Sequence, residues 1–206
     1  METKPTVFLV DDDQAVRNAL ELLLETTQHR TESFASAEDF LEACNPDQPG
    51  CLVLDIRMPS MSGMELQAAL VAKSVTIPII FLTGHGNVSM SAKAFRSGAV
   101  DFLEKPFNEQ VLLRRIEEAI QLDQKNREAA AHRHTVNARM AALTPREREV
   151  MLLIVAGHSN KEIARQLELS TRTIETHRGH IMEKTGAHSL ADLIALALAS
   201  GSRERN

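Results

Sequence analysis

The chain has 206 residues, 43% of them hydrophobic and 25% charged, which is enough for one large domain or two small ones with buried cores. Its apolar runs are far shorter than the roughly 20 residues that cross a bilayer, and its N-terminus does not resemble a signal peptide, so we expect no membrane segment and a cytoplasmic protein. The net charge of −5 is distributed unevenly. Residues 1–122 carry 10 basic against 18 acidic side chains, residues 123–142 carry four against two, and residues 143–206 carry nine against eight. The acidic first part is therefore a poor partner for nucleic acid.

Short apolar runs alternate with amphipathic stretches through the first 120 residues, a pattern typical of β–α units that build a parallel sheet. The runs are Val7 to Val10, a weaker one near Thr31 to Phe34, Cys51 to Leu54, Ile77 to Leu82, and Val100 to Leu103. We therefore predict an α/β domain over residues 1–122 with a five-stranded, parallel, doubly wound sheet. Cys44 and Cys51 lack metal-ligand or redox spacing, and we expect both to be free core thiols.

A long stretch without Pro or Gly follows Pro106 and is rich in Glu, Gln, Arg, Leu and Ala. It predicts one helix over residues 108 to about 136, whose first part carries an apolar face that can pack on the sheet. Beyond Leu122 this face is lost. We therefore expect residues 123–142 to form a solvated helical linker.

From Leu143 onward the pattern predicts helices only. Caps or capping boxes begin at four positions, namely Thr144, Ser159, Ser170 and Ser189. Residues 143–206 should therefore form an all-α, four-helix domain. Its second and third helices, residues 160–167 and 171–185, have the lengths of a helix-turn-helix that reads DNA.

Chemically reactive side chains follow the predicted strands. They are Asp11, Asp12 and Asp13 after the first strand, Asp55 at the end of the third, Thr83 at the end of the fourth, and Lys105 after the fifth. Strand ends of a parallel sheet share one edge, so carboxylates gathered there would repel one another unless a divalent cation such as Mg²⁺ sat among them. Asp55 could then attack phosphorus while Lys105 neutralises charge. Taken singly, each residue could instead be a turn former, and Asp13 also suits a helix cap.

The predicted third helix of the second domain has two different faces. Ile174 and Ile181 should pack inward, whereas small and polar side chains lie opposite. The candidates for phosphate or base contacts are Lys161, Arg172, Glu175, Thr176, His177, Arg178 and Gly179. Any one of them could equally be a plain surface residue.

Residues 5–122 resemble the receiver domain of two-component response regulators. The resemblance lies in Val10-Asp11-Asp12-Asp13, in residues 55–63 (DIRMPSMSG), in Leu82-Thr83-Gly84-His85-Gly86, and in residues 101–107 (DFLEKPF). It implies a flavodoxin-like fold with Asp55 as phosphoacceptor and Mg²⁺ held by Asp11, Asp12, Asp55 and the backbone carbonyl of Arg57. It also implies a cis Lys105–Pro106 bond and phosphoryl sensing by Thr83, Lys105 and Phe102. Phe102 stands where the family usually has Tyr, so it acts by packing alone or is a plain core residue.

Residues 143–199 resemble the LuxR-type output domain of the FixJ and NarL regulators. The matching residues are LTPRE at 143–147, NKEIA at 160–164, Leu169-Ser170, and TIETHR at 173–178. The resemblance implies that residues 171–185 are the recognition helix and that Ser189–Ala199 forms a dimer contact. The turn lacks the usual Gly and contains Glu168-Leu169-Ser170 instead.

Together the two resemblances predict a transcription regulator rather than an enzyme. A sensor histidine kinase would phosphorylate it, it would pair into a homodimer through residues 88–120, and it would bind promoter DNA, with RNA polymerase a candidate partner. Two alternatives stay open. One is an adaptor that acts through protein partners, and the other is a phosphohydrolase with Asp55 as nucleophile, which Arg57 disfavours because such enzymes commonly place an acid there.

Overall fold

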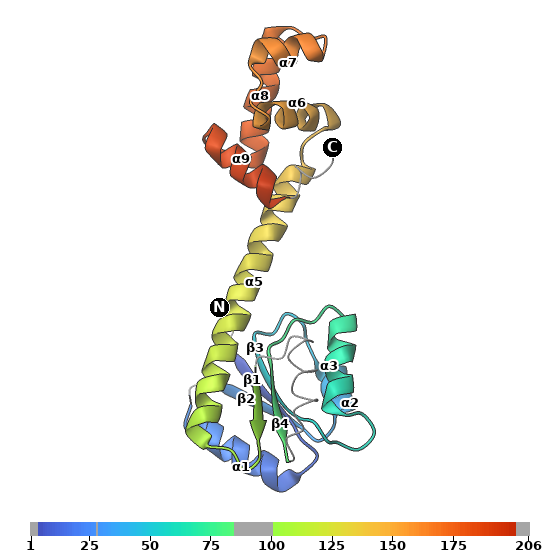
Figure 1. Ribbon diagram of the computed structural model, residues 1–206, viewed down its shortest axis with the longest axis vertical. Helices are drawn as coiled ribbons and strands as arrows, with labels where there is room; N and C mark the ends of the chain where they lie inside the picture. Colours follow the sequence, from blue (N-terminus) through green and yellow to red (C-terminus); the bar gives the residue numbers. More distant parts are fainter. Residues whose placement is uncertain (1–3, 28, 85–100, 201–206) are drawn as a thin grey trace. The chain divides into compact units, whose positions relative to one another are not determined.

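The computed structural model describes residues 4–27, 29–84 and 101–200. The chain divides into two compact units, Met1–Arg127 and Glu128–Asn206, and the division falls within helix α5 (Glu109–Ala141), as Figure 1 shows. Within the described residues, no helix combines the length and the apolar character needed to cross a membrane. His85, Gly86 and residues 88–100 of the expected pairing face lie outside the described residues.

The first unit is built on a parallel sheet with strand order β2-β1-β3-β4-β5. The strands are β1 (Thr6–Val10), β2 (Arg30–Phe34), β3 (Gly50–Asp55), β4 (Ile79–Thr83) and β5 (Asp101–Glu104). Every residue of β1, β3 and β4 is buried, which explains why these central strands read as continuous apolar runs. The predicted five-stranded, doubly wound sheet is confirmed. Val100, where the fifth strand was expected to begin, lies outside the described residues.

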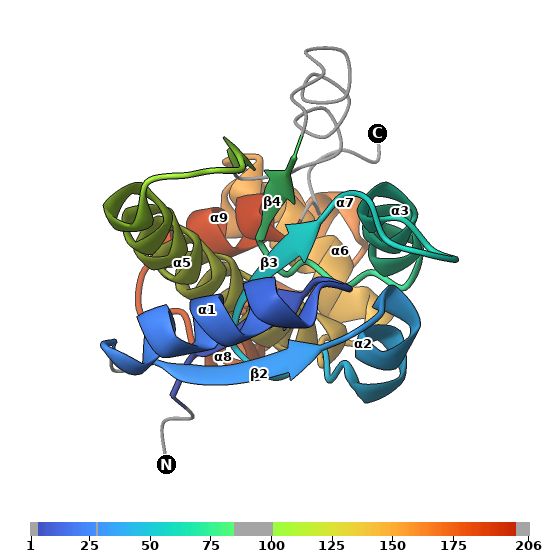
Figure 2. The ribbon, with the colours of Figure 1, turned by 90° about the horizontal axis from the view of Figure 1, so that it is seen from below.

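Helices cover both faces of this sheet, because successive side chains of a strand point to opposite sides. Helix α1 (Gln14–Glu25) and α5 pack on the face that carries Leu9 and Val53, whereas α2 (Ala37–Ala43) and α3 (Gly63–Ala72) pack on the face that carries Phe8 and Leu52. Figure 2 shows the two pairs of helices on opposite sides.

The two cysteines are free, and Cys51 is buried in the sheet, where burial raises the pKa of its thiol. Cys44 is only partly buried. The expectation of a free core thiol is confirmed for Cys51, whereas Cys44, at the end of α2, packs against the apolar cluster of the α2–α3 face without being fully buried.

The second unit consists of the end of α5 and four shorter helices, α6 (Pro145–Val155), α7 (Asn160–Gln166), α8 (Thr171–Thr185) and α9 (Leu190–Ala199). The predicted all-α unit and its caps are confirmed: capping boxes begin α6 at Thr144 and α7 at Ser159, and Ser170 and Ser189 cap the helices that follow. These helices enclose one apolar core.

The stretch expected as a linker contributes buried residues to both units. In the first unit, the buried carboxylate of Asp123 accepts hydrogen bonds from Gly50 N at 2.9 Å and from Arg127 Nε at 2.7 Å. In the second unit, Val136 and Met140 belong to the apolar core. A polar side chain can be buried where its hydrogen bonds are satisfied, and an apolar pattern does not reveal such a position.

Candidate functional site

Two buried carboxylates and one ammonium meet at the carboxyl ends of the strands. Lys105 Nζ donates to Asp11 Oδ2 and to Asp55 Oδ1, each at 2.6 Å. Asp11 is 2% exposed and Asp55 is 6% exposed. Since Asp11 follows β1, Asp55 ends β3 and Lys105 follows β5, the parallel sheet brings these three side chains together as their strand positions predicted.

The backbone around Asp55 is tightly packed. Arg57 N donates to Asp55 Oδ2 at 2.7 Å. At Gly63, the first residue of α3, an added Cβ would lie 2.3 Å from the backbone oxygen of Asp55, so only glycine allows the helix to approach this close. The strand end is therefore held both through the Asp55 carboxylate and through its own backbone.

The charged groups in this pocket shift one another's pKa values. Burial raises the pKa of Asp55, and Asp11 raises it further, against the lowering effect of the hydrogen bond and charge of Lys105. Burial alone would lower the pKa of Lys105, but its hydrogen bonds to Asp11 and Asp55 outweigh this effect and raise it. Two carboxylates thus share one ammonium, and the balance leaves Asp55 less acidic than usual.

The other residues predicted for this site differ in burial. Asp12 is exposed, Asp13 caps α1 by accepting from Ala15 N at 2.8 Å, and Thr83 is buried at the end of β4. Phe102 is partly buried against the apolar cluster of the α2–α3 face, and the side chain of Arg57 is exposed. The Lys105–Pro106 peptide bond is cis, as the family resemblance implied.

The donor set suits Mg²⁺, although no group of three His, Cys, Asp or Glu side chains within the described residues is arranged to hold a metal ion. Mg²⁺ usually binds one or two protein carboxylates and fills its other positions with waters and phosphate oxygens. Asp11 and Asp55 supply two convergent carboxylates, and Asp12 is adjacent in the chain. The residues present therefore fit the ion.

Sequence reasoning missed Arg17, which is 8% exposed in α1. Its NH1 donates to the backbone oxygen of Asp11 at 2.6 Å, and its NH2 donates to the side chain of Gln14. Arg17 lies three and seven positions before the buried Leu20 and Leu24, so it belongs to the buried stripe of the helix. A charged residue within an apolar stripe is the pattern that could have identified it.

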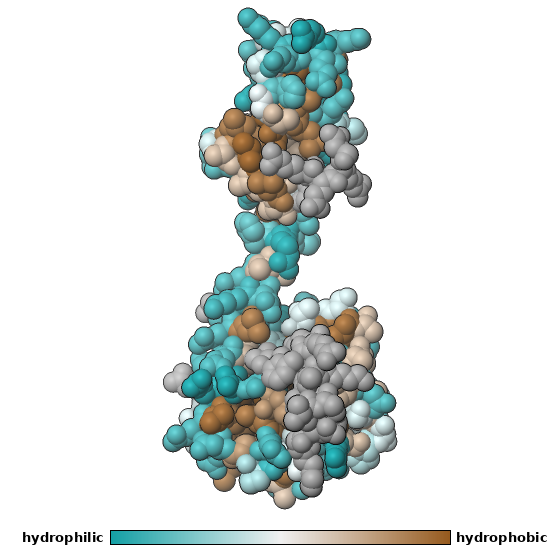
Figure 3. Space-filling view, in the orientation of Figure 1, coloured by the Kyte–Doolittle hydropathy of each residue, from teal (hydrophilic) through white to brown (hydrophobic). Residues whose placement is uncertain are grey.

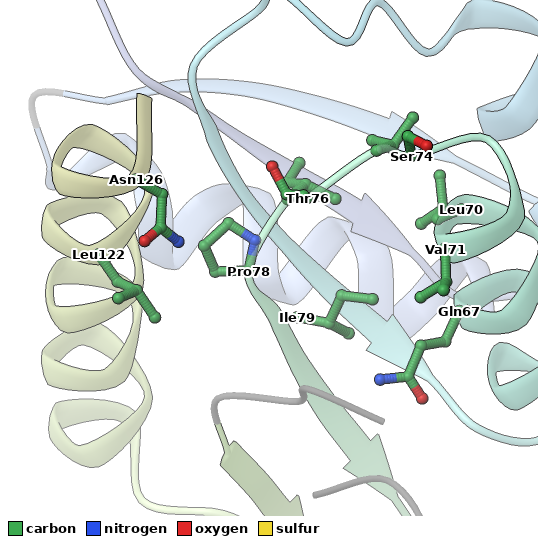
Figure 4. A pocket seen from close by; sticks show the side chains of 11 residues that line it. Gln67, Leu70, Val71, Ser74, Thr76, Pro78, Ile79, Leu122 and Asn126 are labelled. Carbon is green, nitrogen blue, oxygen red and sulfur yellow. The ribbon is translucent and has the colours of Figure 1, made fainter. Parts of the chain in front are cut away.

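A second concavity of about 310 Å³ lies between α3, the loop after it, and α5 (Figure 4). Its lining consists of apolar and uncharged polar side chains such as Val71, Thr76, Leu122 and Asn126. No acidic or basic side chain is among the lining residues that the structure describes, in contrast to the pocket at Asp55.

In the second unit, α7 and α8 form the predicted helix-turn-helix. Glu168 takes a left-handed φ of 55° in the turn, so it adopts the conformation that glycine provides more often. On α8, Ile174 and Ile181 are fully buried, as predicted. Five of the candidate DNA contacts are exposed, namely Lys161 on α7 and Arg172, Glu175, Thr176 and Gly179 on α8.

His177 and Arg178 are less accessible than these five. Both are half-buried, and the Nδ1 of His177 is buried without a hydrogen-bond partner among the described residues. At Gly179 an added Cβ would meet nothing within 4 Å, so this part of the helix surface is open. The open face of α8 therefore carries the exposed candidates, whereas His177 and Arg178 lie at the edge of this face.

An ion pair between the buried carboxylate of Glu147 and the exposed Lys184 joins α6 to α8. Glu147 accepts from Lys184 Nζ at 2.7 and 2.9 Å, and it accepts from Thr144 N at 2.8 Å. The hydrogen bond from Lys184, followed by that from the Thr144 backbone, lowers the pKa of Glu147 to about 2. The sequence predicted Glu147 only as part of a capping box, because Lys184 is 37 residues away.

Comparison with known families accounts for both units. Residues 7–117 match the family described as "Response regulator receiver domain", and residues 141–197 match "Bacterial regulatory proteins, luxR family". The chain is a response regulator. Its receiver unit is Met1–Arg127 and its output unit is Glu128–Asn206, and it is a phosphorylation-dependent regulator of transcription.

Several known proteins are similar to this chain over nearly its whole length. Nodulation protein W of Bradyrhizobium diazoefficiens is 42% identical over 97% of this chain and 88% of that protein. The transcriptional regulatory protein FixJ of the same organism is 42% identical over 98% of both chains. Among solved structures, the response regulator StyR is 46% identical over 95% of this chain and 98% of that chain, with a TM-score of 0.88.

Proposed function

We propose that Asp55 accepts a phosphoryl group from a sensor histidine kinase and that the phosphorylated regulator binds promoter DNA through α8 as a homodimer. The observation that carries this proposal is the convergence of Asp11 and Asp55 on Lys105 Nζ. A buried carboxylate with one ammonium beside it and a second carboxylate behind it is suited to receive a group that brings negative oxygens and a divalent cation.

In this proposal an Asp55 carboxylate oxygen forms the bond to phosphorus while the bond from phosphorus to the kinase imidazole nitrogen breaks, and that nitrogen keeps the electron pair. Lys105 favours the ionised form of Asp55 before transfer and pairs with the phosphoryl oxygens afterwards. Asp11, Asp12, Asp55 and the backbone carbonyl of Arg57 would hold Mg²⁺, which when bound would neutralise charge on those oxygens. Thr83 and Phe102 would respond to the new group.

The output unit has one exposed face suited to DNA binding and another suited to dimer formation. The open side of α8 carries Arg172 and Thr176 toward DNA, with Lys161 on the supporting helix, and His177 and Arg178 at the edge. Apolar side chains gather over α9 in Figure 3, where Leu190 and Leu198 are 45% and 50% exposed. A second copy of this chain would cover them in a dimer. We place the regulator in the cytoplasm, where RNA polymerase is a candidate partner.

Phosphorylation with labelled acetyl phosphate, followed by selection of genomic DNA fragments, tests the proposal. We expect Asp55→Asn to lose labelling, the shift from monomer to dimer in sedimentation velocity, and fragment enrichment, because an amide is a poor nucleophile. Asp47→Asn is the matched control, since Asp47 is exposed at the other end of the strands and should behave as the parent chain does.

Robust labelling of Asp55→Asn together with normal DNA binding would contradict the assignment. If Asp55→Asn lost labelling and dimer formation but the phosphorylated parent chain enriched no DNA fragment, the result would instead favour the adaptor function.

A further inference from the structure

A buried guanidinium lies behind the metal-binding carboxylates, and its partners are neutral. Arg17 donates to the backbone oxygen of Asp11 and to the side chain of Gln14, and it forms no salt bridge with a carboxylate among the described residues. Burying an ionised group is costly unless it is paired or well hydrogen-bonded. An apolar side chain would suit the stripe of Leu20 and Leu24 better. Stability of α1 alone therefore does not account for an arginine at this position.

The bond that Arg17 makes acts on the acid loop, which we define as Asp11–Asp13. The Asp11 backbone oxygen belongs to the planar peptide group that joins Asp11 to Asp12. A charge-assisted hydrogen bond to that oxygen holds the peptide plane, and with it the direction in which the Asp12 side chain leaves the backbone.

The two carboxylates of the loop depend on this bond to different degrees. The Asp11 carboxylate has two further contacts, because Oδ1 accepts from Asp13 N at 2.9 Å and Oδ2 accepts from Lys105 Nζ. The exposed Asp12 carboxylate has no hydrogen bond or ion pair within the described residues. The orientation of Asp12 therefore rests on its backbone.

We propose that Arg17 is a positioning residue for Mg²⁺ binding, which acts through the Asp11 carbonyl and presents the oxygens of Asp11 and Asp12 in a common direction. This inference rests on the proposed function of the pocket. Arg17 touches neither the phosphoryl group nor the ion. Its removal leaves Asp11 bonded to Lys105 but allows the peptide group between Asp11 and Asp12 to rotate. Residues that orient metal ligands from behind typically change metal affinity by about 10- to 100-fold.

The receiver unit offers a matched control in Arg127. Its NH2 donates to the backbone oxygen of Gln48 at 2.8 Å, so it too holds a carbonyl with a guanidinium. Gln48 precedes β3, whereas Asp11 follows β1, so in a parallel sheet the two arginines lie at opposite ends of the strands. Arg17→Met and Arg127→Met remove the same group and keep most of the apolar stem.

Isothermal titration of MgCl₂ into the full chain, without a phosphoryl donor and well below each variant's melting temperature, is the decisive measurement. We expect Arg17→Met to weaken Mg²⁺ binding about tenfold and Arg127→Met to leave it within about twofold of the parent value. Arg17→Lys keeps a cationic donor and should recover part of the affinity. With acetyl phosphate, the slower labelling of Arg17→Met should be restored by raising the Mg²⁺ concentration and not by raising the donor concentration.

Three results would overturn the inference. If folded Arg17→Met bound Mg²⁺ as tightly as the parent chain, the positioning role would be refuted while the proposed phosphoacceptor site would stand. If Arg127→Met weakened binding equally, the effect would be one of general stability. If the parent chain itself bound no Mg²⁺, the proposed function would fail, and the inference with it.

Discussion

Each unit buries a carboxylate beside a lysine ammonium, yet the carboxyl pKa moves in opposite directions in the two. In the receiver unit, Asp11 and Asp55 share Lys105, and burial raises the pKa of Asp55. In the output unit, Glu147 has Lys184 to itself and also accepts from Thr144, so its pKa falls to about 2. The difference is one of charge balance, since the first group has an excess negative charge and the second is neutral as a pair.

This difference distinguishes a functional site in the receiver unit from a structural contact in the output unit. The Glu147–Lys184 pair satisfies its charges internally and joins the start of α6 to the end of α8, so it holds the recognition helix in place. The receiver pocket keeps negative charge that Lys105 does not fully neutralise, and a bound cation would balance it. Functional sites often retain such unfavourable arrangements at the expense of stability.

The largest effect should come from breaking the pair in the output unit. Glu147→Gln removes the carboxylate from Lys184, and we expect it to lower the free energy of unfolding by about 2 kcal/mol, as for other hydrogen bonds to buried charges. Urea unfolding of the full chain, followed by far-UV circular dichroism, measures the loss. Glu149→Gln is the control, because Glu149 forms an exposed ion pair with Arg146 and should change stability by less than about 1 kcal/mol. Equal losses in the two variants would refute the structural role of the Glu147–Lys184 pair.

Acid should remove the contribution of the Glu147 carboxylate to the free energy of unfolding. The folded pKa of Glu147, about 2, lies below the ordinary value of 4.5, so its stabilising effect is present above 4.5 and is lost as the pH falls through about 2. The stability difference between the parent chain and Glu147→Gln should therefore be constant above about pH 5 and shrink steadily below it. Repeating the urea titrations over this range tests the sign. A difference that does not change with pH would show that the carboxylate charge is not what stabilises the unit.

A smaller effect of opposite sign is expected in the receiver unit. Because the folded pKa of Asp55 is raised, its ionised form is less favourable in the folded state than in the unfolded chain. Asp55→Asn removes that charge and leaves Lys105 paired with Asp11, so the free energy of unfolding should rise at neutral pH in the presence of EDTA. The gain should vanish as the pH falls below the ordinary Asp value of 3.8.

Asp47→Asn serves as the neutral reference for this measurement, since Asp47 is exposed in the loop before β3. If Asp55→Asn instead lost as much stability as Glu147→Gln, the Lys105 contacts would outweigh burial. The contrast between the two units would then disappear.

The amino-acid sequence by itself determined the features that depend on neighbouring residues. Apolar runs predicted the strands because a buried strand needs apolar side chains on both faces, and capping boxes predicted the starts of α6 and α7. The meeting of Asp11, Asp55 and Lys105 was also predictable, because strand ends of a parallel sheet share one edge.

Only the tertiary structure decided which polar side chains are buried and what they bind. In the sequence, Asp123 looks like an ordinary charged residue of a helix and Glu147 like part of a capping box. Gly50 lies 73 residues from Asp123, and Lys184 lies 37 residues from Glu147. Local sequence patterns reflect helix and strand propensity and periodicity. Burial of a charge depends instead on a partner from a distant part of the chain, and the neighbouring residues do not indicate that partner.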